Sequence, residues 1–141
     1  MGNKSEKKEN FVRNDADKKR HSPFSLLKSF SCAQEGLSYN FFSQRNMRIH
    51  LLIALIVIIC GFVFNLDLGS WAAVLICIGL VIGGECMNTA IESLVDLVSP
   101  EYQLLAKRAK DSAAAAILVF AVMSVVVGLI VFLPRVIAIL S

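Results

Sequence analysis

One short segment of the chain carries four polar side chains that could do chemistry together. Their positions are separated by three, four and four residues, a spacing that puts them all on one face of an α-helix. We call this set the polar face: Glu85, Asn88, Glu92 and Asp96. It lies at the end of a hydrophobic run, where ionisable residues are costly and usually functional. Such a face can hold a divalent metal ion, exchange a proton, or do both.

The composition is that of a small integral membrane protein. The 141 residues suit one domain, and 56% of them are hydrophobic, which is more than in soluble domains. No basic face interleaved with aromatic residues is present, so the sequence argues against nucleic-acid binding. The spacing of the four cysteines matches neither a metal site nor a disulfide framework.

The helices that must position the polar face follow from the apolar runs. Residues 49–66, 71–98 and 112–133 are each long enough to cross a membrane, and Pro134 is expected to end the last of them. An amphipathic helix is expected over 22–43, lying at the membrane surface or packing on the membrane helices. Residues 1–21 have the composition of a disordered polar tail. We therefore predict an all-α integral membrane protein whose membrane domain spans 22–141.

The distribution of Lys and Arg predicts the orientation. The 65–70 turn has none, whereas the 99–111 connector and the N-terminal side have several, so the positive-inside rule places the latter two in the cytoplasm. From Leu66 to Glu85 a helix rises about 28 Å, close to the hydrocarbon thickness of about 30 Å. Glu85 is thus expected near the inner hydrocarbon boundary, with Glu92 and Asp96 beyond it.

This placement would suit phosphoryl transfer from ATP to a membrane-bound alcohol. Glu92 is placed to hold the magnesium ion of ATP, and Glu85 to act as the base for a lipid hydroxyl. Asn88 could hold a phosphate oxygen or a metal-bound water, and Lys110 could stabilise charge on the phosphoryl group. No Walker A or kinase glycine-rich loop is present. The residues alone leave an ion or proton path as an equal alternative, although the apolar outer halves of the helices argue against it.

Three motifs make the sequence similar to a known family: E-x-x-N-T-A-I-E-x-x-x-D from residue 85, S-P-E-Y from residue 99, and A-K-D from residue 109. Together they resemble the prokaryotic diacylglycerol kinase family, which includes undecaprenol kinases, over about residues 22–133. The stretch from Asn46 to His50 is closer to the undecaprenol kinase branch.

The resemblance implies a homotrimer in the bacterial cell membrane, with active sites between subunits on the cytoplasmic side. It implies ATP as phosphoryl donor, Mg²⁺ as cofactor and a lipid alcohol as acceptor, with undecaprenol favoured over diacylglycerol. Glu85 would be the catalytic base, Asn88 an essential neighbour, and Glu92 a metal ligand that also positions ATP. The expected nucleotide contacts are Glu101, Tyr102, Lys110 and Asp111, and the expected lipid contacts are Asn46, Arg48 and His50.

Gln44 departs from the family pattern. The family usually has a glutamate there, which is the second metal ligand. A carboxamide keeps an oxygen donor but loses the charge, so metal affinity should fall. Either Gln44 still ligates weakly, or Glu101 or a water takes its place, or catalysis is impaired. A weakened kinase and a non-catalytic membrane subunit are therefore the alternatives to a lipid kinase.

Overall fold

The computed structural model describes residues 26–140, which form four α-helices. These are α2 (Leu26–Ser43), α3 (Arg45–Val63), α4 (Leu68–Val98) and α5 (Leu104–Leu140). The chain divides into two units between residues 35 and 36, so that α2 crosses the boundary. The predicted tail over 1–21 and the predicted helix start at residue 22 lie outside the described residues.

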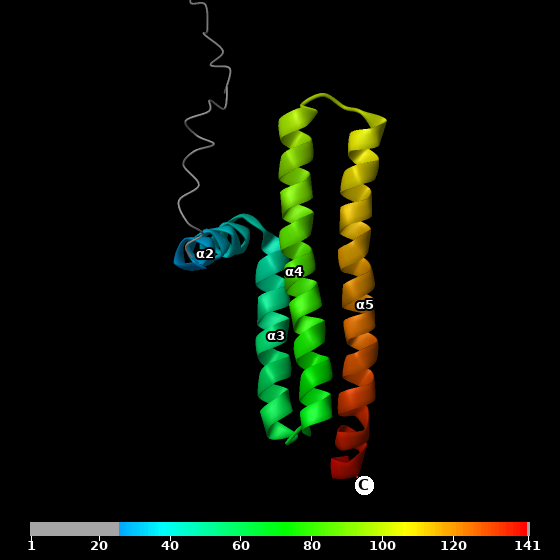
Figure 1. Cartoon of the computed structure of the whole chain (residues 1–141). Coiled ribbons are helices and arrows are strands. Elements are labelled where there is room, and N and C mark those ends of the chain that lie inside the picture. The colour runs from blue at the N-terminus through cyan, green and yellow to red at the C-terminus, as the bar shows by residue number, and fades with distance from the viewer. Residues whose placement is uncertain (1–25, 141) are drawn as a thin grey trace, which may run out of the picture. The chain divides into compact units, whose positions relative to one another are not determined.

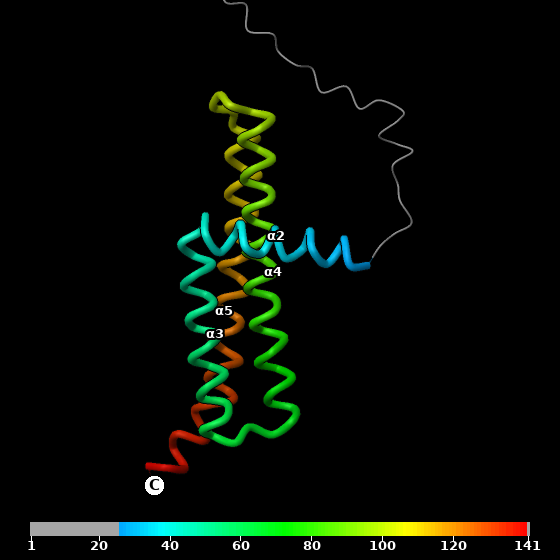
Figure 2. The backbone as a smooth tube through the Cα atoms, turned by 90° about the vertical axis from the view of Figure 1, so that its left-hand side faces the viewer, coloured from blue at the N-terminus to red at the C-terminus, as the bar shows by residue number. Residues whose placement is uncertain are grey.

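Three of these helices are long and apolar enough to cross a membrane, as predicted: α3, α4 and α5. α4 is the central helix, packing extensively against α5 and along a shorter stretch against α3 (Figure 1). Among the described helices, α3 and α5 have no close backbone contact. α4 and α5 extend beyond the start of α3 at the end where they are connected to each other (Figure 2). The all-α membrane fold expected from the sequence is therefore confirmed.

Two glycines allow close helix packing. A Cβ atom at Gly84 would come within 2.9 Å of both Ile117 and Phe120 of α5, so only glycine lets α4 approach α5 this closely. A Cβ atom at Gly61 of α3 would lie 2.6 Å from the Trp71 ring. Gly61 therefore leaves the space in which Trp71 of α4 rests against α3.

The α3–α4 turn is fastened to α5 by a small polar cluster. Asp67 is the N-cap of α4 and accepts hydrogen bonds from the backbone N–H (3.1 Å) and the hydroxyl (2.6 Å) of Ser70. Arg135 of α5 donates to the same carboxylate at 2.7 Å. The Ser70 hydroxyl, more than any other group, lowers the pKa of Asp67 from 3.8 to about 2. We call Asp67, Ser70 and Arg135 the Asp67–Arg135 clasp.

The helix ends differ from those predicted. α3 begins at Arg45, earlier than the start expected at residue 49, because polar side chains at the edge of a membrane do not prevent backbone hydrogen bonding. α4 also starts earlier than expected, at Leu68, because Asp67 caps it. Most of the predicted 99–111 connector is the first part of α5, which begins at Leu104.

α5 also continues through Pro134, where we expected it to end. Proline removes one backbone N–H from the helix. The carbonyl that loses this donor is that of Ile130, four residues back. The Arg135 guanidinium donates to the next carbonyl, that of Val131. The helix runs on through the proline to Leu140.

Candidate active site

The polar face lies on α4, and its exposure increases along the helix. Glu85 is 2% exposed and Asn88 8% exposed, Glu92 is half-buried, and Asp96 is exposed. Glu85 and Asp96 are about 16 Å apart along the helix axis at a rise of about 1.5 Å per residue. The face thus presents a buried carboxylate at one end and a solvated carboxylate at the other.

Asn88 and Glu92 form a bonded pair in the middle of this face. The Asn88 Nδ2 group donates to Glu92 Oε1 at 3.1 Å. The Asn88 Oδ1 atom is buried and, within the described residues, receives no hydrogen bond. A buried carbonyl oxygen without a partner is costly, so a ligand that coordinates or donates to it would be favoured.

The Asn88–Glu92 pair fits a magnesium ion. Mg²⁺ prefers oxygen ligands and is usually held by one or two carboxylates together with substrate phosphates and water. The free Asn88 Oδ1 atom and the Glu92 carboxylate are donors of this kind. No cluster of three or more His, Cys, Asp or Glu side chains suited to a metal occurs among residues 26–140. A metal held here would thus depend on phosphate oxygens for the rest of its ligands.

Gln44, the predicted second ligand, is carried by α3. It is the N-cap of that helix, is half-buried, and makes no side-chain capping hydrogen bond. α3 and α4 run antiparallel (Figure 1). Gln44 therefore lies at the end of α3 that is nearer to the polar face. Within the described residues, no hydrogen bond joins its side chain to Glu92.

Of the three predicted lipid contacts, one lies in the cavity between the membrane helices. His50 is half-buried and lines this cavity together with Ile82, which lies about one turn before Glu85 on α4. Asn46 is exposed one turn before His50 on the same side of α3. Arg48 is exposed and lies about 200° around the helix from His50, so it points away from this cavity.

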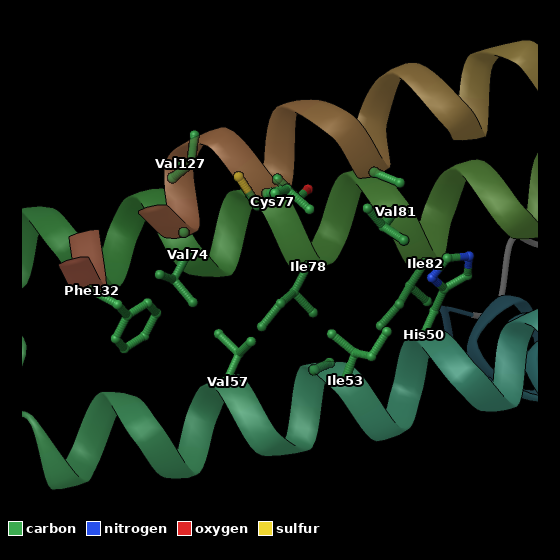
Figure 3. A pocket seen from close by; sticks show the side chains of 15 residues that line it. His50, Ile53, Val57, Val74, Cys77, Ile78, Val81, Ile82, Val127 and Phe132 are labelled. Atoms are coloured by element: carbon green, nitrogen blue, oxygen red, sulfur yellow. The ribbon is translucent and has the colours of Figure 1, made fainter. Parts of the chain in front are cut away.

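An apolar cavity of about 280 Å³ begins at His50 and runs along the three membrane helices (Figure 3). Side chains of α3, α4 and α5 all line it. Its lining is aliphatic apart from a few residues, among them Ser124, whose hydroxyl is bonded to the Phe120 carbonyl. Sequence reasoning missed this cavity, because its Val, Ile and Ala side chains are those of any membrane helix.

The predicted nucleotide contacts lie near the α4–α5 connection. Lys110 of α5 donates to Asp96 of α4 at 2.6 Å, and Lys107 pairs with Asp111 on α5. The sequence motifs did not reveal the bond between Asp96 and Lys110, because it joins different helices. The other two residues predicted to bind ATP, Glu101 and Tyr102, are exposed in the connection. Within the described residues, no hydrogen bond joins their side chains to the polar face.

This arrangement can bring a soluble polyphosphate to a hydroxyl group held in the membrane. The buried Glu85 lies about one turn beyond Ile82, the last residue of α4 that lines the cavity. The oxygen donors for a metal lie one to two turns further along, and a lysine lies at the solvated end. In phosphoryl transfer the carboxylate could act as the base, and the metal donors and the lysine could neutralise charge and position the phosphates.

Comparisons with known proteins point to the same chemistry. The profile of the family described as prokaryotic diacylglycerol kinase matches residues 31–132. An undecaprenol kinase of Bacillus subtilis is 42% identical over 110 residues, covering 78% of this chain and 89% of that protein. A diacylglycerol kinase of Synechocystis sp. is 44% identical over 110 residues, covering 77% of this chain and 63% of that protein. A diacylglycerol kinase of Escherichia coli K12 is 26% identical over 101 residues, covering 72% and 83%.

Proposed function

This chain belongs to the prokaryotic diacylglycerol kinase family and is a lipid kinase, and we propose that it transfers the γ-phosphoryl group of ATP to the hydroxyl of undecaprenol. The observation that carries this proposal is the buried Glu85, which lies between the apolar cavity and the Asn88–Glu92 pair. Undecaprenol is favoured because the similarity to the Bacillus subtilis undecaprenol kinase extends over 89% of that protein. Diacylglycerol is the second candidate, since the sequence identity to the Synechocystis diacylglycerol kinase, 44%, is close to the 42% found for the undecaprenol kinase.

In the proposed reaction, Glu85 takes the proton of the lipid hydroxyl as its oxygen attacks the γ-phosphorus of ATP. A bond forms between the lipid oxygen and phosphorus, the bond to the β–γ bridging oxygen breaks, and ADP leaves. The proton stays on Glu85 until it passes to solvent. A general base of this kind contributes about 10² to 10⁴ in rate.

Glu92 and the free oxygen of Asn88 would hold Mg²⁺, with Gln44 as a weak additional donor from α3. The ion would neutralise charge on the β- and γ-phosphates. Asn88 also fixes the Glu92 carboxylate through its own N–H, so the pair is already oriented before nucleotide binds.

Lys110 would contact the phosphates of ATP from the solvated end, and Asp111, Glu101 and Tyr102 would border the nucleotide. Lys110 is half-buried and already fixed by Asp96, whereas Glu101 and Tyr102 are exposed in the α4–α5 connection.

The cavity would take the part of the lipid chain nearest the hydroxyl. Its volume of about 280 Å³ is near the lower end of the range for ligand pockets, about 300–1,000 Å³, so it accommodates a short segment of a long prenyl chain. His50, at the end of the cavity nearer to Glu85, would orient the hydroxyl. Asn46 lies on the path to His50, and Arg48 faces the lipid around the protein.

The proposed working form is a homotrimer in the bacterial cell membrane, with the polar face on the cytoplasmic side. The chain alone leaves most of its membrane helices uncovered. In the most apolar stretch of α5, only 6% of the residues are buried. A neighbouring subunit would cover part of this surface and close the site around the polar face.

The test is transfer of labelled γ-phosphate from ATP in membranes that contain the chain, with undecaprenol and diacylglycerol offered separately. We expect labelling of undecaprenol, and a fall of at least about 100-fold for Glu85→Gln, a change that keeps side-chain size while removing the base. Labelling of diacylglycerol alone would overturn the proposed acceptor. No labelling of either lipid over a wide magnesium range, with the protein folded, would favour a disabled kinase.

A further inference from the structure

We propose that Asp96 is a positioning residue that holds Lys110 in line with the metal-binding part of the polar face, so that the lysine is oriented for nucleotide before ATP arrives. The inference rests on the proposed function in one respect, the contact between Lys110 and the phosphates of ATP. Asp96 has no role in the reaction as described above, although it completes the polar face.

The geometry that supports this inference is the bond between Asp96 and Lys110. Lys110 Nζ donates to Asp96 Oδ1 at 2.6 Å, from the first turns of α5 to the last turn of α4. Asp96 lies one helical turn, about 5.4 Å, beyond Glu92 on the same face of α4. The bond therefore puts the lysine ammonium beside the place where phosphates of a metal-bound nucleotide would lie.

Lys110 can bind a phosphate without leaving Asp96. A lysine ammonium has three N–H donors, and the hydrogen bonds of the described residues use one of them, toward Asp96. Two donors remain for phosphate oxygens. Asp96 and ATP thus need not compete for the lysine, and the ternary arrangement of carboxylate, lysine and phosphate is possible.

Fixing the lysine matters because its side chain is long and flexible. Part of the rotamer entropy of a lysine is lost whenever its head group is fixed. The pair is partly exposed, at 35% for Lys110 and 66% for Asp96, so it contributes little to the stability of the fold. Its main effect should therefore be on the binding of ATP.

The opposite end of the molecule offers a matched control. The Asp67–Arg135 bond also joins α4 to α5, at 2.7 Å, with a comparable exposure of 27% for Arg135 and 64% for Asp67. It is remote from the polar face. If the Asp96–Lys110 bond only fastened the two helices together, breaking either pair would have the same effect on the enzyme.

The experiment measures KM for ATP, KM for lipid and thermal stability of the full chain in four variants: Asp96→Ala, Lys110→Met, the double variant and Asp67→Ala. We expect Asp96→Ala to raise KM for ATP about fivefold, which corresponds to about 1 kcal/mol, and to leave KM for lipid unchanged. In the Lys110→Met background Asp96→Ala should have no further effect, since it acts through the lysine. Asp67→Ala should leave both KM values unchanged.

Two results would overturn the inference. One is an unchanged KM for ATP in Asp96→Ala while Lys110→Met raises it. The other is an equal effect of Asp96→Ala with and without the lysine. An unchanged KM for ATP in Lys110→Met would instead refute the nucleotide contact on which the inference rests, and absence of ATP-dependent lipid labelling in the wild type would refute the proposed function.

Discussion

At the scale of single residues, Gln44 would set how much negative charge faces a metal ion in the proposed site. Its carboxamide supplies an oxygen but no charge, and it is the N-cap of α3. Hard divalent cations bind carboxylates more tightly than amides. The proposed site therefore has a lower affinity for magnesium than one with glutamate at this position.

Gln44→Glu should lower the magnesium concentration that gives half-maximal lipid phosphorylation, by about tenfold if the added charge contributes about 1.4 kcal/mol. The measurement is a magnesium titration of the initial rate at saturating ATP and lipid. A neighbouring exposed change, Ser43→Glu, controls for a general increase in negative charge. An unchanged magnesium response in Gln44→Glu would count against Gln44 as a metal ligand.

The lowered pKa of Asp67 predicts a pH dependence of stability. Hydrogen bonds from Ser70, with a smaller contribution from Arg135, hold its folded-state pKa at about 2, against 3.8 ordinarily. A group whose pKa is lowered by folding stabilises the protein above its unfolded pKa, and that stability is lost as the pH falls through the folded value. Between pH 4 and about pH 2 the clasp should therefore lose its contribution.

Asp67→Asn isolates this effect, because asparagine is also a good N-cap. The wild type should melt at a higher temperature than Asp67→Asn at pH 5, and the difference should shrink as the pH falls toward 2 and vanish below it. Thermal unfolding of the detergent-solubilised protein across this range measures it. A difference that persists at the lowest pH would mean that the Asp67 charge is not its source.

At the scale of helices, part of the cavity is open because a glycine lines it. Gly128 of α5 lines the cavity, and a Cβ atom there would meet nothing within 4 Å. A leucine at this position would therefore enter the space proposed for the lipid chain. Gly79 of α4 is equally unobstructed but exposed and outside the cavity, which makes it a matched control.

Gly128→Leu should raise KM for undecaprenol about tenfold if it excludes two methylene groups of the lipid, at about 0.8 kcal/mol each. Gly79→Leu should leave that KM unchanged, and neither variant should alter KM for ATP. Initial rates over a range of lipid mole fractions in mixed micelles give these values. Equal behaviour of the two variants would show that the cavity does not receive the lipid.

The helices show what local spacing can predict and what it cannot. The common face of Glu85 and Asp96 follows from the helical period, a property of the backbone alone, and the structure places both on α4. The end predicted at Pro134 was wrong, because α5 continues through the proline to Leu140. The bond between Asp96 and Lys110 could not be predicted, since it depends on how α5 is placed against α4.

At the scale of the whole molecule, the proposed trimer would affect the active site as well as the mass of the assembly. Glu85 and the Asp96-bound Lys110 lie about 16 Å apart along α4. The resemblance to the family implies that active sites lie between subunits. A neighbouring subunit would then complete the site around the polar face of each chain.

Light scattering of the detergent-solubilised protein should give a protein mass of about three chains of 15.4 kDa each. A monomeric mass would contradict the proposed trimer.

α5 is the longest of the three membrane helices. Its apolar part from Ser112 to Leu140 rises about 42 Å, whereas the hydrocarbon core of a bilayer is about 30 Å thick. The Asp67–Arg135 clasp anchors it at a polar boundary, and beyond Arg135 the exposed side chains of Ile137, Ile139 and Leu140 are again apolar. A thin bilayer leaves this end in the headgroup layer or forces the helix to tilt, and a thicker one covers it. The acyl-chain length of the surrounding lipids thus becomes a variable that acts on the enzyme through hydrophobic mismatch.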